Sequence, residues 1–300
     1  MLIDPCAADW LLSLPIANRE PSSDAPAGQA WYALVDTAFV PGCYRLLQRH
    51  KDTLPARYLF DLSSDPRADL AAVSPVLFPL HESQQKEWRA ILQQTDRWPM
   101  LTLISTTESL DELALRLSSW CVVDADGQDF VLRFADTRRL PDVVGVLDET
   151  QRAELFGPAR EILYRDRVAQ WQNLPTSPTA QPPAIQVKLS AKQFGALVEA
   201  SGADEIMAQF SKNEPTLLAA HKPSQAYSRI SRALALATSL GISPSDRTNW
   251  SRLFLRWEAV EDLPDLSTLI QQYRNDGYDY FSLEQKVLGS ARGASLGKAK

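Results

Sequence analysis

The stretch Ser119-Trp-Cys-Val-Val-Asp-Ala-Asp-Gly-Gln-Asp-Phe-Val-Leu-Arg-Phe-Ala-Asp-Thr-Arg138 predicts a β-hairpin. Two runs rich in β-branched and aromatic residues flank the Asp-Gly dipeptide at 126–127, which readily adopts the positive φ angles of a tight hairpin turn. The second run places Phe130, Leu132 and Phe134 on one face, so we expect one buried face and one wetter face. The stretch holds no nucleophile–base pair and no metal-ligand spacing, which indicates a structural element.

The segments on either side of the hairpin alternate between strand patterns and helix patterns. Apolar runs predict strands at residues 31–36, 57–62, 76–80 and 100–105. A helical repeat covers 83–94, and capping signals at Ser105-Thr-Thr-Glu108 and Asp148-Glu-Thr-Gln151 open two further helices. We therefore expect an α/β (α+β) N-terminal domain over residues 1–172, with a mixed sheet and flanking helices.

A proline-rich segment follows this domain. It holds four prolines in the eleven residues from Asn173 to Pro183, which predicts an extended linker over 173–184. Beyond it the strand patterns vanish and helical spacing dominates, so residues 185–288 are predicted to form an all-α C-terminal domain. The small, polar and basic tail 289–300 is predicted to be disordered.

Composition excludes several classes of function. The 300 residues carry a net charge of −6, and nucleic-acid binding depends on neutralising phosphates with Lys and Arg, so nucleic acid is not expected as a partner. Cys6, Cys43 and Cys121 are too scattered for a disulfide framework or a zinc site. The first residues lack a basic signal region, and no apolar run reaches the ~18 residues of a membrane span. We expect a cytoplasmic protein.

Three carboxylates follow predicted strands. Asp36, Asp61 and Asp136 occupy the strand-end positions where sites of α/β sheets often form, so they are candidates for metal binding or for acid–base catalysis. Arg133 and Arg138 supply ion-pair partners and no His or Cys accompanies them, which favours a structural strand-end cluster. There is no phosphate-binding loop, nucleophile elbow or zinc motif. We therefore predict no catalytic, cofactor-binding or metal-binding residue and no cofactor.

Aromatic residues of the helical domain fall into two groups. One group, within 250–257, recurs at helical spacing, which is typical of a core-facing stripe and alternatively of a groove for a partner helix. The other lies in the turn-like run Asp-Gly-Tyr-Asp-Tyr-Phe at 276–281, where aromatics are better interface candidates. The candidate partner-binding residues are Trp250, Phe254, Trp257, Tyr278, Tyr280 and Phe281.

Residues 31–166 contain a series of short motifs in a defined order. The motifs are Trp31-Tyr-Ala-Leu-Val-Asp36, Leu59-Phe-Asp61, Val73-Ser-Pro-Val-Leu-Phe-Pro-Leu80, the strand from Met100 to Ser105, Trp120, Phe130-Val-Leu-Arg-Phe-Ala-Asp136 and Phe156-Gly-Pro158. In order and spacing this series resembles the adaptor/chaperone family of bacterial type VI secretion, the Tap/Tec type, formerly a domain of unknown function. The resemblance covers about half of the chain, and the part after the linker has no motif that can be matched residue by residue.

The resemblance implies a non-enzymatic adaptor that binds a toxic effector in the cytoplasm and helps to load it onto the VgrG spike. It implies two protein partners, the effector and VgrG, and it brings no catalytic residues. The helical domain is expected to set the choice of effector. Two other hypotheses stay open: a hydrolase that uses Asp36, Asp61 and Asp136, and a helical regulatory module that binds nucleic acid, which the net charge disfavours.

Overall fold

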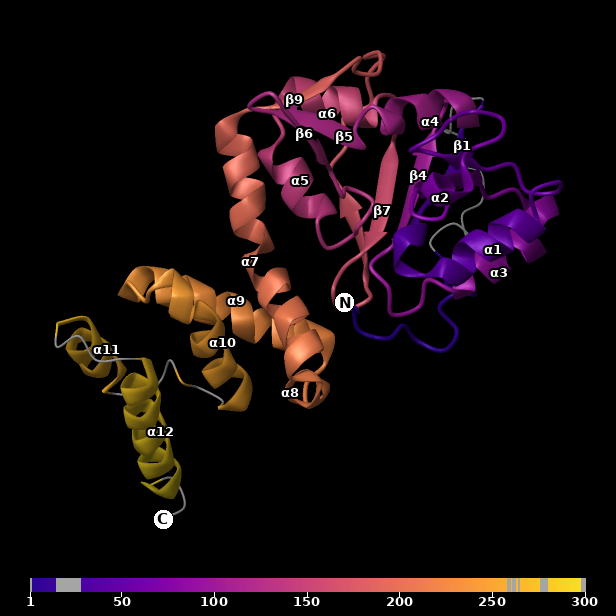
Figure 1. Ribbon diagram of the computed structural model, residues 1–300. Coiled ribbons are helices and arrows are strands. Elements are labelled where there is room, and N and C mark those ends of the chain that lie inside the picture. Colours follow the sequence, from indigo (N-terminus) through magenta and orange to yellow (C-terminus); the bar gives the residue numbers. More distant parts are fainter. Residues whose placement is uncertain are drawn as a thin grey trace. The chain divides into compact units, whose positions relative to one another are not determined.

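The chain forms two compact units. The computed structural model describes residues 2–14, 28–257, 260, 263, 265–275 and 280–297, with the backbone alone at 274 and 291–297. One unit spans Leu2–Glu199 and the other begins at Ala200. The described strands all belong to the first unit and the second is helical, so the predicted fold class is confirmed (Figure 1). Helix α7 (Ala191–Asn213) begins in the first unit and continues into the second.

The first unit is built on a six-stranded antiparallel sheet with the order β2-β3-β1-β4-β7-β8. Its strand β1 (Ala30–Asp36) lies between β3 (Pro75–Pro79) and β4 (Leu101–Thr106). Most of β1 is buried, as its nearly continuous apolar run predicts for a strand covered on both faces. Pro79 is the last residue of β3, where its missing N–H costs nothing. The other strands are β2 (Arg57–Tyr58), β7 (Glu161–Arg165) and β8 (Trp171–Leu174).

Helices cover both faces of this sheet. Because successive side chains of a strand point to opposite faces, β1 sends Tyr32 and Leu34 into one core and Ala33 and Val35 into the other. Helices α4, α5 and α6 complete the first core, and α1 and α3 complete the second (Figure 1). The helices are α1 (Pro41–Arg49), α2 (Ala68–Ala71), α3 (Gln85–Gln93), α4 (Leu110–Ser118), α5 (Leu140–Val146) and α6 (Glu149–Phe156).

Helix α4 begins one turn later than the sequence predicted. Strand β4 continues through Thr106, whose Oγ1 accepts a hydrogen bond from the Glu108 N–H at 3.2 Å. The capping box is therefore formed by Ser109 and Glu112, with hydrogen bonds of 2.8 Å and 3.3 Å between the two residues. The box predicted at Asp148 and Gln151 forms as expected.

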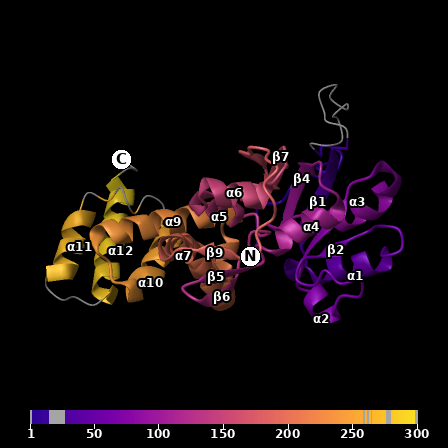
Figure 2. The same cartoon turned by 90° about the horizontal axis from the view of Figure 1, so that it is seen from above.

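The predicted hairpin forms in a separate three-stranded sheet. Strands β5 (Val122–Ala125) and β6 (Gln128–Val131) pair antiparallel, and β9 (Val187–Leu189) joins β5 in parallel (Figure 2). Asp126 and Gly127 have φ angles of 53° and 75°, as the two-residue turn requires. The parallel partner comes from a distant part of the chain, so local patterns gave no sign of it.

The alternation of the second hairpin run is confirmed by burial, although the strand is shorter than expected. Phe134 is buried and Phe130 and Leu132 are partly buried, whereas Val131 is 61% exposed. Strand β6 ends at Val131, and one further bond joins the two strands, from the Leu132 N–H to the Cys121 carbonyl at 3.0 Å. Turn-type hydrogen bonds then replace the ladder, for example from the Asp136 N–H to the Arg133 carbonyl at 3.2 Å.

The proline-rich segment 173–184 does not separate the two units. The first two residues of this segment belong to strand β8, and strand β9, which comes after the segment, lies in the same unit as β8. Its middle is bound to the first unit: the Thr179 N–H donates to the Gly157 carbonyl at 2.9 Å, and the Gln181 carbonyl accepts from Arg116 at 3.0 Å. An extended chain leaves such backbone groups available for other elements. The boundary between the units therefore lies within α7, after the predicted linker.

The second unit is a set of amphipathic helices. Gly241 ends α9 with a left-handed φ of 70°, as the sequence indicated. A disordered tail was predicted from residue 289, but helix α12 continues to Gly297, and residues 298–300 lie outside the described part of the chain. None of the described helices combines the length and the apolar character needed to cross a membrane. The helices are α8 (Pro215–Ala219), α9 (Pro223–Leu240), α10 (Arg247–Arg256), α11 (Leu266–Asn275) and α12 (Tyr280–Gly297).

Candidate functional site

Four of the five predicted strand-end residues meet where β1 ends. Arg133 donates to Asp36 with Nη2 and Oδ2 3.0 Å apart. Arg138 makes two hydrogen bonds to the carboxylate of Asp136, at 3.0 Å and 2.7 Å. The ring of Phe39 lies 5.0 Å and 5.6 Å from the two guanidinium carbons. Two ion pairs therefore share one aromatic ring, an arrangement that we call the strand-end cluster.

The two residues just before β4 bring the two carboxylates together. The Asp36 N–H donates to the Met100 carbonyl at 3.0 Å, and the Thr137 N–H donates to the Pro99 carbonyl at 2.9 Å. Residues that are far apart in the sequence thus bind neighbouring carbonyls. Each carboxylate also accepts from the backbone two residues ahead of it, Asp36 from Ala38 and Asp136 from Arg138, both at 3.1 Å. These short-range bonds are those of turn-forming Asp residues.

The electrostatics of the cluster are those of a buried carboxylate beside an arginine. Burial raises the pKa of Asp36 above its ordinary value, the Arg133 guanidinium opposes this shift, and the Asp136 carboxylate adds to it. Both Asp side chains are buried, and both already accept hydrogen bonds from Arg and from backbone. A general acid or base needs a face that is open to substrate. The cluster instead anchors the end of the hairpin region to the main sheet.

Asp61 lies apart from the cluster. It follows β2, which is separated from β1 by β3. Its carboxylate accepts from the Arg67 N–H at 2.9 Å and from the Ser63 N–H at 3.1 Å, and these bonds lower its pKa. The predicted set of five is therefore divided. The hydrogen bonds of Asp61 are separate from those that join the other four residues.

The predicted aromatic residues also divide. Trp250 and Phe254 are buried in the core of the second unit with ring centroids 5.4 Å apart, and the Trp250 indole N–H donates to the Ala233 carbonyl at 2.9 Å. They form core and not an open groove. Trp257 is partly buried against that core, and Tyr280 is buried in it. Phe281 is 64% exposed, as an interface residue would be. Tyr278 lies outside the described residues.

The described residues offer no evident metal site, because no three His, Cys, Asp or Glu side chains gather among them. The ring of His221 is bonded at 2.8 Å to the Leu255 carbonyl, near the end of α10. A groove of about 1020 Å³ lies in the first unit between α1, the β2 region and α4. The ion pair of Arg57 and Asp111, with atoms 2.6 Å apart, belongs to its lining.

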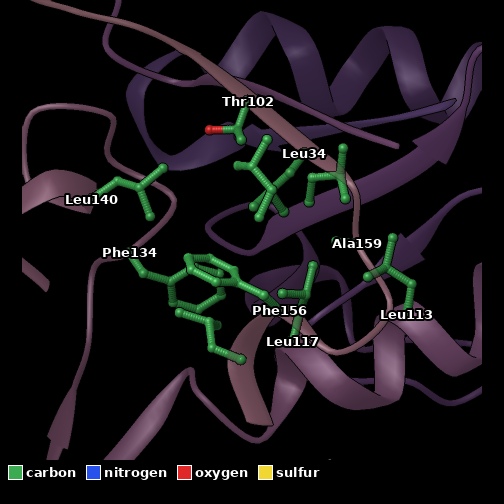
Figure 3. Close-up of a pocket in the computed structure, with 11 residues that line it drawn as sticks. Leu34, Thr102, Leu113, Leu117, Phe134, Leu140, Phe156 and Ala159 are labelled. Atoms are coloured by element: carbon green, nitrogen blue, oxygen red, sulfur yellow. The ribbon is translucent and has the colours of Figure 1, made fainter. Parts of the chain in front are cut away.

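A small cavity of about 20 Å³ lies between the main sheet and helices α4, α5 and α6. Its lining is apolar except for Thr102 of β4, which pairs across the sheet with Leu34. Figure 3 shows the Thr102 oxygen among apolar side chains, including Leu140 and Phe134. No hydrogen-bond partner reaches this oxygen within the described part of the chain. The cavity is large enough for one water but offers a water too few polar partners.

A buried arginine clamp was not predicted from the sequence. Arg116 of α4 is buried and donates to the Glu108 carboxylate at 2.7 Å and to the Glu154 carbonyl at 2.7 Å. Gly157 leaves room for it, because a Cβ at that position would lie 2.4 Å from the guanidinium carbon. An arginine on a helix is usually exposed, and no local pattern distinguishes a buried one.

The comparison with protein families gives one match. Residues 31–154 match the model of a family described as a domain of unknown function, DUF4123. The matched residues run from β1 to α6 and include the strand-end cluster and the hairpin, but they are less than half of the chain. No curated protein and no solved structure matches the chain.

Proposed function

We propose that this protein is a non-enzymatic adaptor of bacterial type VI secretion. It binds a toxic effector protein in the cytoplasm and helps to load it onto the VgrG spike. The observation that carries the proposal is the match of residues 31–154 to DUF4123, because this family is associated with type VI secretion effector adaptors. The motifs that resemble the Tap/Tec type lie almost entirely within the matched residues.

The geometry of the strand-end cluster supports binding over catalysis. Asp36 and Asp136 are held by arginines in a buried position, and Asp61 lies beyond β3. The chain would then act through its surfaces, with the first unit as the common scaffold and the second unit setting the choice of effector. Exposed apolar side chains such as Phe281 suit a surface that is covered by a partner.

Affinity purification of the tagged protein from its own cells tests the proposal. The cells must express the secretion genes, and the purification is run at two salt concentrations before mass spectrometry. Recovery of a large toxin-like protein together with VgrG supports the adaptor function. Recovery of neither overturns it.

Exchange of the second unit tests how the work is divided. The residues from 200 onward are replaced by those of a relative with a different effector, so that the junction lies at the unit boundary. The effector recovered with the hybrid should follow the second unit. If it follows the first unit, effector choice resides in residues 2–199.

The rival hydrolase hypothesis has its own test. The single substitutions Asp36→Asn, Asp61→Asn and Asp136→Asn remove each carboxylate while keeping its size. An adaptor with any of these changes should still recover its partners once the variant is shown to be folded. Loss of a hydrolytic activity, measured against ester, peptide and phosphoester substrates, would instead assign an enzyme.

A further inference from the structure

The three-stranded sheet of β6, β5 and β9, which we call the small sheet, has one covered face and one bare face. On the covered face Val123 is buried and Phe130 packs against Phe194 of α7, with ring centroids 4.4 Å apart. On the bare face Val122 is 47% exposed and Val131 is 61% exposed. These two valines are direct cross-strand partners in β5 and β6, so they form one continuous apolar spot.

Two carboxylates lie directly opposite each other beside this apolar spot. Asp124 and Asp129 are the next cross-strand pair on the same face. Like charges in that position destabilise a sheet. Asp124 is partly compensated, because it accepts from the Gly127 N–H at 2.8 Å and lies 4.0 Å from the Lys188 ammonium. Asp129 is exposed, and its side chain has no hydrogen-bond or ion-pair partner among the described residues.

The same residues lie on a free sheet edge. Strand β6 is the outer strand of the order β6-β5-β9. Leu132 donates to the Cys121 carbonyl at 3.0 Å, so the alternation of an antiparallel ladder turns the N–H and C=O of Asp129 and Val131 away from β5. No other described element makes a backbone hydrogen bond to them. The strand holds no Pro or Lys, so its only charged side chain is that of Asp129.

We propose that β6 binds an extended segment of a protein partner as an added strand. The segment would place a basic side chain beside Asp129 and an apolar side chain, two residues away, beside Val131. The basic residue would compensate the Asp124–Asp129 pair, and the backbone would satisfy the free groups of the edge. This inference deepens the adaptor function and rests on it for the identity of the partner. A second copy of the chain fits less well, because its own edge brings further carboxylates.

Peptide binding to the full chain tests the edge directly. The probe is a labelled peptide, Thr-Val-Thr-Lys-Thr-Val-Thr-Lys-Thr, and its analogue has Glu in place of both Lys residues. Fluorescence anisotropy should show that the Lys peptide binds about tenfold more tightly than the Glu peptide, with a preference that weakens as salt increases. Equal binding of the two peptides, or no binding of either, overturns the proposal.

Three variants locate the site. Asp129→Lys should reverse the preference between the peptides. Val131→Ser removes the apolar contact without changing the charge, so it should weaken binding of the Lys peptide. Val168→Ser is the matched control, because Val168 is a similarly exposed valine outside the small sheet, and it should bind as the unmodified chain does. Asp129→Lys removes a like-charge pair, so its melting temperature should not fall. If either β6 variant binds as the control does, the edge is not the site.

Partner recovery separates this inference from the adaptor function. If the unmodified chain recovers effector and VgrG and both β6 variants recover them equally well, the added-strand proposal fails and the adaptor function stands. If the unmodified chain recovers neither, the adaptor function fails, and the peptide titration still decides whether the edge binds a basic strand. Self-association that is weakened by Val131→Ser and not by Val168→Ser would assign the edge to a second copy and overturn the proposal.

Discussion

Replacing Thr102 by Val should stabilise the first unit. Thr102 is 2% exposed, its hydroxyl has no partner within the described residues, and the cavity beside it is otherwise lined by apolar side chains. A buried polar group without a hydrogen bond costs about 1–3 kcal/mol. Val keeps the shape and the β-branching of Thr, so strand propensity and cavity size hardly change. The free energy of unfolding should therefore rise by about 1–3 kcal/mol.

The same substitution at Thr106 provides a matched control with the opposite sign. Thr106 is buried on the same strand, but its Oγ1 accepts from the Glu108 N–H at 3.2 Å. Thr106→Val leaves that N–H without its acceptor, so it should cost about 1 kcal/mol. Two chemically identical changes four residues apart should thus move stability in opposite directions.

Denaturant titration combined with hydrogen exchange measures both effects. Because the two units need not unfold together, exchange of the β4 amides read by mass spectrometry reports the first unit by itself. A gain of 1 kcal/mol corresponds to a rise of about 3 °C in Tm for a unit of this size. If Thr102→Val is neutral or destabilising, the Thr102 hydroxyl has a bound water or another partner, and the cavity argument is wrong.

Three further predictions concern other parts of the fold. Gly157→Ala should lower stability by about 2 kcal/mol or more in thermal melts, because Gly157 has a φ of 51° and a new Cβ would lie 2.4 Å from Arg116; an unchanged Tm would mean that the arginine has room to move. Burial raises the pKa of Asp36, so its carboxyl stabilises the folded state below its unfolded pKa and that contribution is lost as the pH rises through the folded pKa. The Tm of the unmodified chain, relative to the Tm of Asp36→Asn, should therefore fall from pH 3 to pH 7. A relative rise would contradict the raised pKa. In urea titrations Phe281→Ser should change stability by less than about 0.5 kcal/mol and Phe254→Ala should cost about 3–5 kcal/mol; similar costs would show that Phe281 is not a surface residue.

The elements that could be predicted are those that local patterns determine. The apolar runs at 31–36, 76–80 and 100–105 became β1, β3 and β4, because a strand covered on both faces needs apolar side chains throughout. The run at 57–62 became only the two-residue β2. There Asp61 bonds to backbone N–H groups ahead of it and turns the chain, and side-chain bonds of this kind compete with a ladder.

The elements that could not be predicted depend on distant partners. Strand β9 is three residues long and exists because Val123, Asp124 and Ala125 of β5 pair with it. The extended segment 173–184 is fixed by Arg116, which comes from a helix far earlier in the chain. Proline content predicts an extended backbone, but it does not determine what that backbone binds.

The strand-end carboxylates show the same limit for a site. Asp36, Asp61 and Asp136 share one local pattern, an acidic residue after an apolar run. Strand order separates them, because β3 lies between the strand that ends at Asp36 and the one that precedes Asp61. The two residues before β4, in contrast, bind the backbone of both Asp36 and Thr137. Spacing along the sequence contains no information on strand order. Asp36 and Asp136, which meet, therefore cannot be distinguished in the sequence from Asp61, which does not join them.

The hairpin is the place where sequence and structure together say most about function. Once the turn is fixed at 126–127, the register follows, and it sets Asp124 opposite Asp129 and Val122 opposite Val131. The sequence alone does not reveal that this face is bare and that the edge is free. A hairpin with only a structural role would be more stable with Thr or Lys at position 129. The repulsion between Asp124 and Asp129 lies at an open edge beside exposed valines. A surface that binds a basic strand would have such a repulsion in the free protein, and the bound strand would relieve it.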